Sequence, residues 1–109
     1  MSPGTAVWIT GVGAATPLGH GCEAIGDGLL AGRSGVRQVT SFPVADHPSQ
    51  VAAWMDRVPC PAGWSEAEFA RLSRHEQLVL WCCASALRDA GWWDRRADVR
   101  VGLVLVVGA

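Results

Sequence analysis

The stretch Ala6–Gly21, AVWITGVGAATPLGHG, constrains the fold more than any other part of this chain. Its first residues, Val7–Thr10, are β-branched or aromatic, and they predict a strand in the interior of a sheet. We expect Gly11 and Gly13 to end that strand in a tight bend, because glycine enters positive φ freely. Thr16-Pro17 then predicts a helix start, since the hydroxyl can cap the helix and proline presets φ for the first turn.

The composition is that of a folded and weakly charged chain. Half of the 109 residues are hydrophobic, 17% are charged, and the net charge is −1. Such a chain is too apolar to be disordered, and it has no electrostatic basis for binding nucleic acid or an anionic membrane. We expect no signal peptide, because no basic segment followed by an apolar one opens the chain, and the apolar run Leu78–Leu87 is too short to span a bilayer. These features predict one small domain in the cytoplasm.

Two longer helices and one short helix are predicted from the spacing of apolar residues and from the capping patterns. Gly21–Ala31 carries apolar residues at helical spacing and is followed by Gly32, a residue typical of helix C-termini. Ser73–Ala90 is the stronger prediction, because the S-x-x-E pattern at its start is that of a capping box. The same pattern at Ser65 predicts a short helix before it.

Two further strands complete the predicted order of elements. Ser49–Met55 is expected to be a strand between an extended loop, Val36–Pro48, and a surface linker, Asp56–Ser65. Arg100–Val107 is a continuous β-branched run, typical of a strand buried on both faces. The order is therefore strand-helix-strand-helix-strand. Because an interior strand needs neighbours and cover, we expect residues 1–109 to be the front portion of a longer protein.

Six segments occur in an order that resembles the N-terminal part of a β-ketoacyl-[acyl-carrier-protein] synthase. The opening VWITGVGAATPLGHG is similar to that family's first strand and turn, and SQVAAWM to its second strand. The other similar segments are Leu29–Val36, Ser41-Phe42, Ala70–Gly91 and the final VRVGLVLVVGA. The resemblance implies a thiolase-like α/β layered fold. Residues 1–109 would form the N-terminal fragment of it, β-α-β-α-β with a mostly buried sheet, and only part of the family's N-terminal domain.

The resemblance also implies an activity, that of an acyltransferase in fatty acid or polyketide synthesis. Such an enzyme joins acyl and malonyl thioesters in a decarboxylating Claisen condensation. A cysteine takes the acyl group from an acyl carrier protein and two histidines assist, and all three come after the point where this sequence stops. We therefore expect no catalytic, cofactor-binding or metal-binding residue within 1–109, and no activity of this chain alone, which leaves its status as an enzyme open. The full-length protein is expected to bind acyl carrier protein and to form a homodimer or heterodimer.

Three other functions are compatible with the sequence. The first is a chain-length-factor-like or other non-catalytic subunit of a polyketide synthase. The second is an α/β domain that binds a dinucleotide through Gly11-x-Gly13-x-x-Thr16. Against it, the third glycine of that fingerprint is missing, and Pro17 removes an N–H that would face the pyrophosphate. The third is a non-catalytic interaction module.

Cys83 is a candidate nucleophile inside the chain, because Cys83-Ala84-Ser85 resembles the family's nucleophile motif. A reactive cysteine should open a helix, where the dipole lowers its pKa, whereas Cys83 lies inside a predicted helix. We therefore interpret Cys83 as a core residue. The sequence has no C-x-x-C pair, which argues against a zinc site or a thioredoxin-like site. Because no secretion signal is expected, all four cysteines are predicted to be reduced thiols: Cys22, Cys60, Cys82 and Cys83.

We interpret the histidines and the tryptophans as structural residues. None of the histidines has a partner at metal-ligand spacing. They are predicted to lie in surface loops (His20, His47) and at the rim of the long helix (His75). Trp8 and Trp81 fall in apolar runs and are predicted to lie in the core. Trp92-Trp93 predicts a partly exposed apolar patch that another part of the protein or a second subunit would cover.

Overall fold

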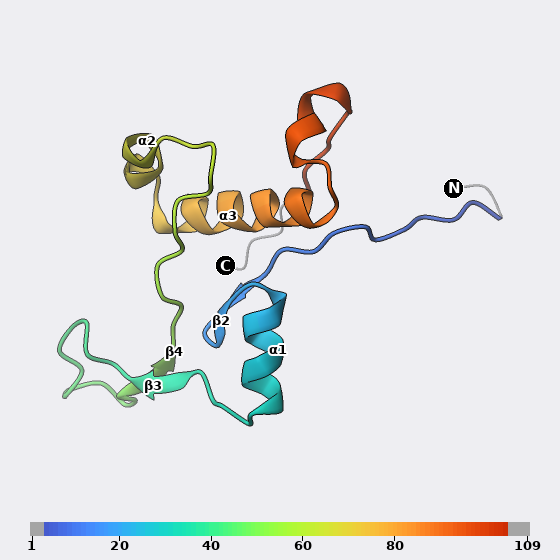
Figure 1. Ribbon diagram of the computed structural model, residues 1–109. Coiled ribbons are helices and arrows are strands. Elements are labelled where there is room, and N and C mark those ends of the chain that lie inside the picture. Colours follow the sequence, from blue (N-terminus) through green and yellow to red (C-terminus); the bar gives the residue numbers. More distant parts are fainter. Residues whose placement is uncertain (1–3, 105–109) are drawn as a thin grey trace.

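The helix α3, Arg74–Asp89, is the longest element, and α2 and η1 lie at its two ends (Figure 1). The computed structural model describes residues 4–104. The other elements are β1 (Ala15–Thr16), β2 (Gly19–His20), α1 (Cys22–Leu30), β3 (Val36–Gln38), β4 (Val51–Ala53), α2 (Glu66–Arg71) and the 3-10 helix η1 (Trp93–Asp98). Within residues 4–104 the strands form two separate antiparallel pairs, β1 with β2 and β3 with β4.

The helix α1 confirms the prediction for Gly21–Ala31 at both ends. Gly21 is its N-cap residue, and Gly32 follows its C-cap with a φ of 69°. The N–H of Gly32 donates to the Leu29 carbonyl and the N–H of Arg33 to the Gly28 carbonyl, at 3.1 and 3.0 Å. These two bonds form a Schellman motif, which satisfies carbonyl groups that the helix itself leaves unpaired.

The prediction that Thr16-Pro17 starts a helix is wrong. Thr16 closes β1, and its hydroxyl accepts a hydrogen bond from the Leu18 N–H at 3.1 Å. Threonine hydroxyls form such local turns as readily as helix caps, because both need only a nearby backbone N–H. The chain therefore makes the β1–β2 hairpin first and enters α1 only at Cys22.

The capping patterns at Ser65 and Ser73 are both confirmed. The Ser73 hydroxyl accepts from the Glu76 N–H at 3.2 Å, and the Glu76 carboxylate accepts from the Ser73 N–H at 3.0 Å. At the start of α2 the Ser65 hydroxyl accepts from the Glu68 N–H at 3.3 Å. Each cap of this kind contributes about 1 kcal/mol to helix stability.

The predicted first strand is not formed. Residues 5–14 belong to no strand, and Val7, Trp8 and Ile9 are 73%, 81% and 87% exposed. The prediction that Trp8 lies in the core is therefore wrong. A strand needs a partner for its N–H and C=O groups, and within residues 4–104 neither of the two antiparallel pairs extends to this segment.

The other two predicted strands are also corrected. Only Val51–Ala53 of the segment 49–55 is a strand, β4, and it pairs with β3, which lies in the segment expected to be a loop. Residues 100–104 are exposed and belong to no strand, and residues 105–107 of that prediction lie outside the described residues. Residues 4–104 therefore form two separate antiparallel strand pairs in place of one buried β-α-β-α-β sheet.

A small core lies between α3 and the segments before it. Phe69 of α2 and Ala84 of α3 are buried. The buried Gln77 side chain donates to the Phe69 carbonyl at 2.9 Å, so its polar amide is satisfied. Val58 and Pro61 are buried too, so the predicted surface linker 56–65 is in part a core segment. None of the helices in the described part of the chain is long and apolar enough to cross a membrane.

Candidate functional site

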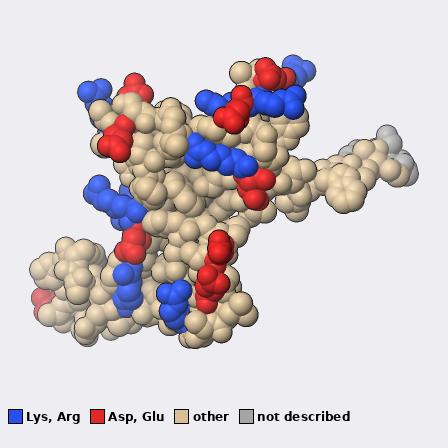
Figure 2. All heavy atoms as spheres, in the orientation of Figure 1, with Lys and Arg blue, Asp and Glu red and all other residues tan. Residues whose placement is uncertain are grey.

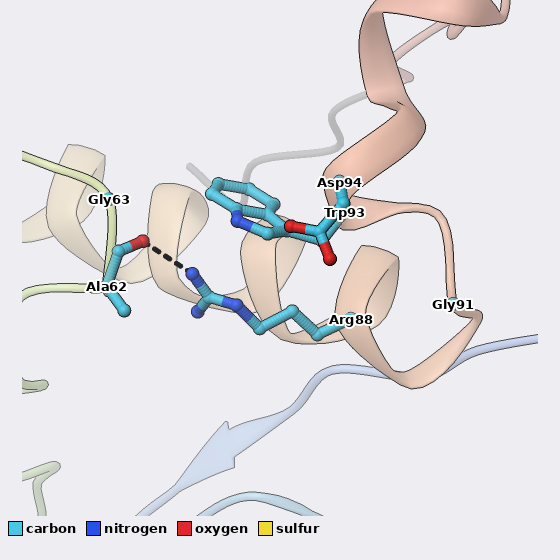
Figure 3. A pocket seen from close by; sticks show the side chains of 6 residues that line it. All are labelled: Ala62, Gly63, Arg88, Gly91, Trp93 and Asp94. Carbon is cyan, nitrogen blue, oxygen red and sulfur yellow. Dashed lines mark hydrogen bonds between the residues drawn. The ribbon is translucent and has the colours of Figure 1, made fainter.

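An open pocket lies at the carboxyl end of α3, where three segments meet (Figure 3). Its volume is about 400 Å³, and its lining residues are Ala62, Gly63, Arg88, Gly91, Trp93 and Asp94. Arg88 comes from the last turn of α3 and Trp93 begins η1. The Arg88 guanidinium donates to the Ala62 carbonyl and lies 4.3 Å from the centre of the Trp93 ring.

The contacts in this pocket join segments of the chain to one another. The Arg96 guanidinium also lies over Trp93, 4.0 Å from the ring centre, so two cations share one indole. Neither a thiol nor an imidazole lines the pocket. Cation–π contacts and the bond to Ala62 tie the linker, α3 and η1 together, and among the described lining residues the only carboxylate is that of Asp94.

Trp92 and Trp93 are partly exposed, as predicted, and arginine side chains lie over both rings. Both residues are half-buried. Arg95 lies 4.9 Å from the Trp92 ring centre, and Arg88 and Arg96 lie over Trp93. Arginines of this same chain therefore lie over the two indole rings that the sequence analysis expected another part of the protein or a second subunit to cover.

Cys83 lies in the middle of α3, as predicted, and is half-buried. It lines an almost wholly apolar groove of about 420 Å³, whose other lining residues are Trp64, Leu72, His75, Glu76, Val79, Leu80 and Leu103. A thiol at this position lacks the N–H groups of a helix N-terminus that would stabilise a thiolate. The position supports packing and gives no sign of nucleophilic catalysis.

The neighbouring thiol, Cys82, is held in its neutral form. Burial raises its pKa, the adjacent Cys83 raises it further, and a hydrogen bond with the Ala15 backbone opposes this only in part. All four cysteines are free. Cys22 is the first residue of α1 and is exposed.

The histidines are spread over the molecule. His75 lies exposed in the first turn of α3 and His47 in an exposed loop, as predicted. His20 is not in a surface loop: it belongs to β2, its Nε2 lies 3.1 Å from the Asp56 carbonyl oxygen, and its ring centre lies 5.6 Å from that of Trp81. Within the described part of the chain, no cluster of three or more His, Cys, Asp or Glu side chains is placed to bind a metal.

The structure contradicts the dinucleotide interpretation of Gly11-x-Gly13-x-x-Thr16. Neither Gly11 nor Gly13 has a positive φ, and both lie in an extended segment against α3. The Val12 N–H donates to the Asp89 carboxylate at 2.9 Å. A dinucleotide site needs this turn directly before a helix N-terminus. Here the hairpin β1–β2 separates the glycines from α1.

The family match and the individual relatives indicate the same protein family. Residues 5–109 match the family described as "Beta-ketoacyl synthase, N-terminal domain". A putative polyketide β-ketoacyl synthase 1 of Streptomyces halstedii is 37% identical over 100 residues, which are 91% of this chain and 24% of the relative. The tetracenomycin polyketide synthase ketoacyl synthase alpha subunit of Streptomyces glaucescens is 36% identical over 85 residues, 78% of this chain and 20% of that protein.

A bacterial 3-oxoacyl-[acyl-carrier-protein] synthase 2, from Rhizobium meliloti strain 1021, is 30% identical over 115 residues, 94% of this chain and 26% of the relative. The chain thus spans about a quarter of the length of the curated relatives it matches. The family match covers nearly all of the chain. The protein therefore belongs to the β-ketoacyl synthase family, whose N-terminal domain it matches and whose fold is thiolase-like.

Proposed function

We propose that residues 1–109 form the N-terminal part of a β-ketoacyl-[acyl-carrier-protein] synthase that condenses acyl and malonyl thioesters with loss of CO₂. The observation that carries this proposal is the match of residues 5–109 to the N-terminal domain of the family. The relatives are named as polyketide or 3-oxoacyl-[acyl-carrier-protein] synthases, so both polyketide and fatty acid synthesis are compatible pathways.

The role of this segment is structural, and the nucleophilic cysteine and the two histidines come from beyond residue 109. The positions of its own candidates support this division. Cys83 lies in the middle of α3, and the pKa of Cys82 is raised by burial. The His20 ring is already engaged by the Asp56 carbonyl and by Trp81. The isolated chain is therefore inactive in condensation.

Acyl carrier protein is the proposed partner, and the whole protein works in the cytoplasm as a homodimer or heterodimer. One relative is named an alpha subunit, which supports an assembly of unlike subunits, and others carry acyl carrier protein in their names. The second candidate function is a chain-length-factor-like subunit without the nucleophile. The names of the relatives, which are synthases, favour the catalytic subunit.

A radioactive acyl-transfer assay tests the proposed inactivity. The purified chain of 109 residues is incubated with labelled acyl carrier protein thioester and with malonyl carrier protein, beside a complete β-ketoacyl synthase as positive control. We expect labelled product only in the control. Turnover by the chain alone would contradict the proposal.

A second measurement separates the catalytic from the non-catalytic subunit. The coding sequence is read past codon 109 and aligned with the relatives at the nucleophile position. A cysteine there supports the synthase, and another residue supports the chain-length-factor-like alternative.

A further inference from the structure

We propose that Arg57 and Arg74 form a binding site for a small phosphate monoester, in a pocket between the β3–β4 pair and the amino end of α3. The inference goes beyond the proposed function and does not depend on it. The pocket has a volume of about 530 Å³, which is within the range of small-molecule sites. Four segments line it: the β1–β2 turn, the β3–β4 loop, residues 53–57 and the first residue of α3.

The two arginines bring two uncompensated positive charges to this pocket. Among the described residues, neither guanidinium lies within 4.0 Å of a carboxylate oxygen. Asp56 lines the pocket as well, but its carboxylate is paired with Arg37 at 3.3 Å. Arg57 and Arg74 therefore repel one another in a pocket whose acid already has a partner. An anion bound between them removes this repulsion.

Arginines at the opposite end of α3 show how this chain engages a guanidinium group when it uses one for structure. Arg88 and Arg96 both lie over the Trp93 ring, and each donates a hydrogen bond to a backbone carbonyl. Among the described residues, neither Arg57 nor Arg74 lies over an aromatic ring in this way. Their guanidinium groups therefore remain available to a ligand, although they come from separate segments of the chain and line one pocket.

The extent of the charged surface indicates a small ligand. Figure 2 shows basic groups above and below an acidic one between the amino end of α3 and the β3–β4 pair, whose positions Figure 1 gives. Two cations in one pocket fall short of the row of phosphate contacts through which proteins bind nucleic acid. The net charge of the whole chain, −1, gives no wider attraction to a polyanion. The ligand is therefore a single anionic molecule.

A phosphate monoester matches the pocket in charge and in geometry. It carries about −1.5 to −2 charges at pH 7, close to the sum of the two guanidinium charges, whereas a carboxylate or a sulfonate carries one. A planar guanidinium donates two parallel N–H bonds to phosphate oxygens. The Ser41 hydroxyl lines the same pocket and supplies a further donor.

An apolar wall accounts for the organic group of the ester. Trp54, Met55 and Pro17 line the pocket and are half-buried. Arg37 lies 4.2 Å from the centre of the Trp54 ring and donates to the Trp54 carbonyl at 3.1 Å. The indole is therefore held in place before a ligand binds. An organic group beside this fixed ring gains affinity that inorganic phosphate cannot gain.

Isothermal titration calorimetry of the purified chain with phenyl phosphate tests this inference. Inorganic phosphate, which lacks the ring, and benzenesulfonate, which carries a single charge, are the comparison ligands. We expect phenyl phosphate to bind about tenfold more tightly than either, and its affinity to fall as salt is added, because the arginines are exposed. Equal affinity for the three ligands, or no binding of phenyl phosphate, would overturn the proposal.

Two variants and a matched control locate the site. Arg57→Gln and Arg74→Gln each remove one charge from the pocket, whereas Arg71→Gln removes an exposed charge in the last turn of α2, outside the pocket lining. We expect each pocket variant to weaken phenyl phosphate binding about tenfold, and Arg71→Gln less than about twofold, because only the former lose a charge-assisted hydrogen bond. Far-UV circular dichroism checks that the helices persist. If Arg74→Gln loses helix, Arg57→Gln decides, because Arg57 lies outside the helices.

Equal weakening by all three variants would reveal a general effect of charge and would overturn the site. NMR spectroscopy gives an independent position for the ligand. Phenyl phosphate should shift the indole N–H signal of Trp54, assigned with Trp54→Phe, and leave that of Trp93 unchanged. A shift at Trp93 without one at Trp54 would place the ligand at the other end of α3 and contradict the proposal.

Discussion

Gly13 lies so close to the backbone of α3 that a Cβ atom on it would fall 2.1 Å from the carbonyl oxygen of Cys82. One turn further along, a Cβ on Gly11 would fall 2.3 Å from the Ala86 carbonyl oxygen. These two glycines therefore act through their small size and not through positive φ. Because they have no side chain, they let an extended segment lie in direct contact with the backbone of a helix.

The first prediction concerns Gly13→Ala. Because the clashing atoms are helix backbone, neither partner can move away cheaply, and we expect the substitution to reduce the free energy of unfolding by about 1–3 kcal/mol. Urea unfolding followed by circular dichroism measures the change. Gly26→Ala is the matched control. Open space surrounds Gly26 within α1, so alanine there should stabilise the chain by up to about 1 kcal/mol. Equal destabilisation by both variants would contradict the proposed contact.

The second prediction concerns the capping box of α3. Ser73→Ala removes the acceptor for the Glu76 N–H, and we expect a loss of about 1 kcal/mol in the free energy of unfolding. Glu76→Gln is the control, because glutamine keeps an acceptor for the Ser73 N–H and should cost less. Thermal and urea unfolding of the three chains give the comparison. A silent Ser73→Ala would show that packing alone holds this end of the helix.

The helix ends were predictable because their determinants are local. Ser73 and Glu76 are three residues apart, and the Gly32 motif involves only the last turn of α1. The strands were not predictable in the same way. Val7–Thr10 has the composition of a buried strand, but pairing depends on segments distant in sequence, and the described residues supply none. The composition of Val7–Thr10 indicates that a strand there would need a pairing partner, but it does not show whether the chain provides one.

The contacts at the candidate site could not be predicted from the sequence for the same reason. The Arg88–Ala62 bond joins residues 26 positions apart, and the His20–Asp56 contact joins residues 36 apart. Neither pair has a motif that could reveal it. The dinucleotide pattern at Gly11 and Gly13 was misleading for a related reason. A sequence does not show whether a glycine serves a turn or a close approach to a helix.

The third prediction concerns Arg88. Arg88→Ala removes the bond to the Ala62 carbonyl and one cation over Trp93, and we expect a loss of about 1 kcal/mol in unfolding free energy because the site is exposed. The tryptophan emission spectrum should also change as the Trp93 ring loses its cover. Arg71→Ala, at an exposed arginine in the last turn of α2, is the control and should leave emission unchanged. An unchanged spectrum in Arg88→Ala would contradict the contact.

The last prediction concerns the pH dependence that Cys82 imposes. Burial raises its pKa above the ordinary value of 9.0, so the folded chain holds the thiol proton more tightly than the unfolded chain does. Below pH 9.0 both states are protonated and the stabilising contribution is fully present. As the pH rises above 9.0, the unfolded state loses its proton first, and the free energy of unfolding falls. Urea unfolding at pH 7.5 and at several values above 9 measures the slope, and Cys82→Ala should flatten it. An equal slope in Cys82→Ala would assign the effect to other groups.

Iodoacetamide should also label Cys82 more slowly than the exposed Cys22, because a thiolate is the reactive form.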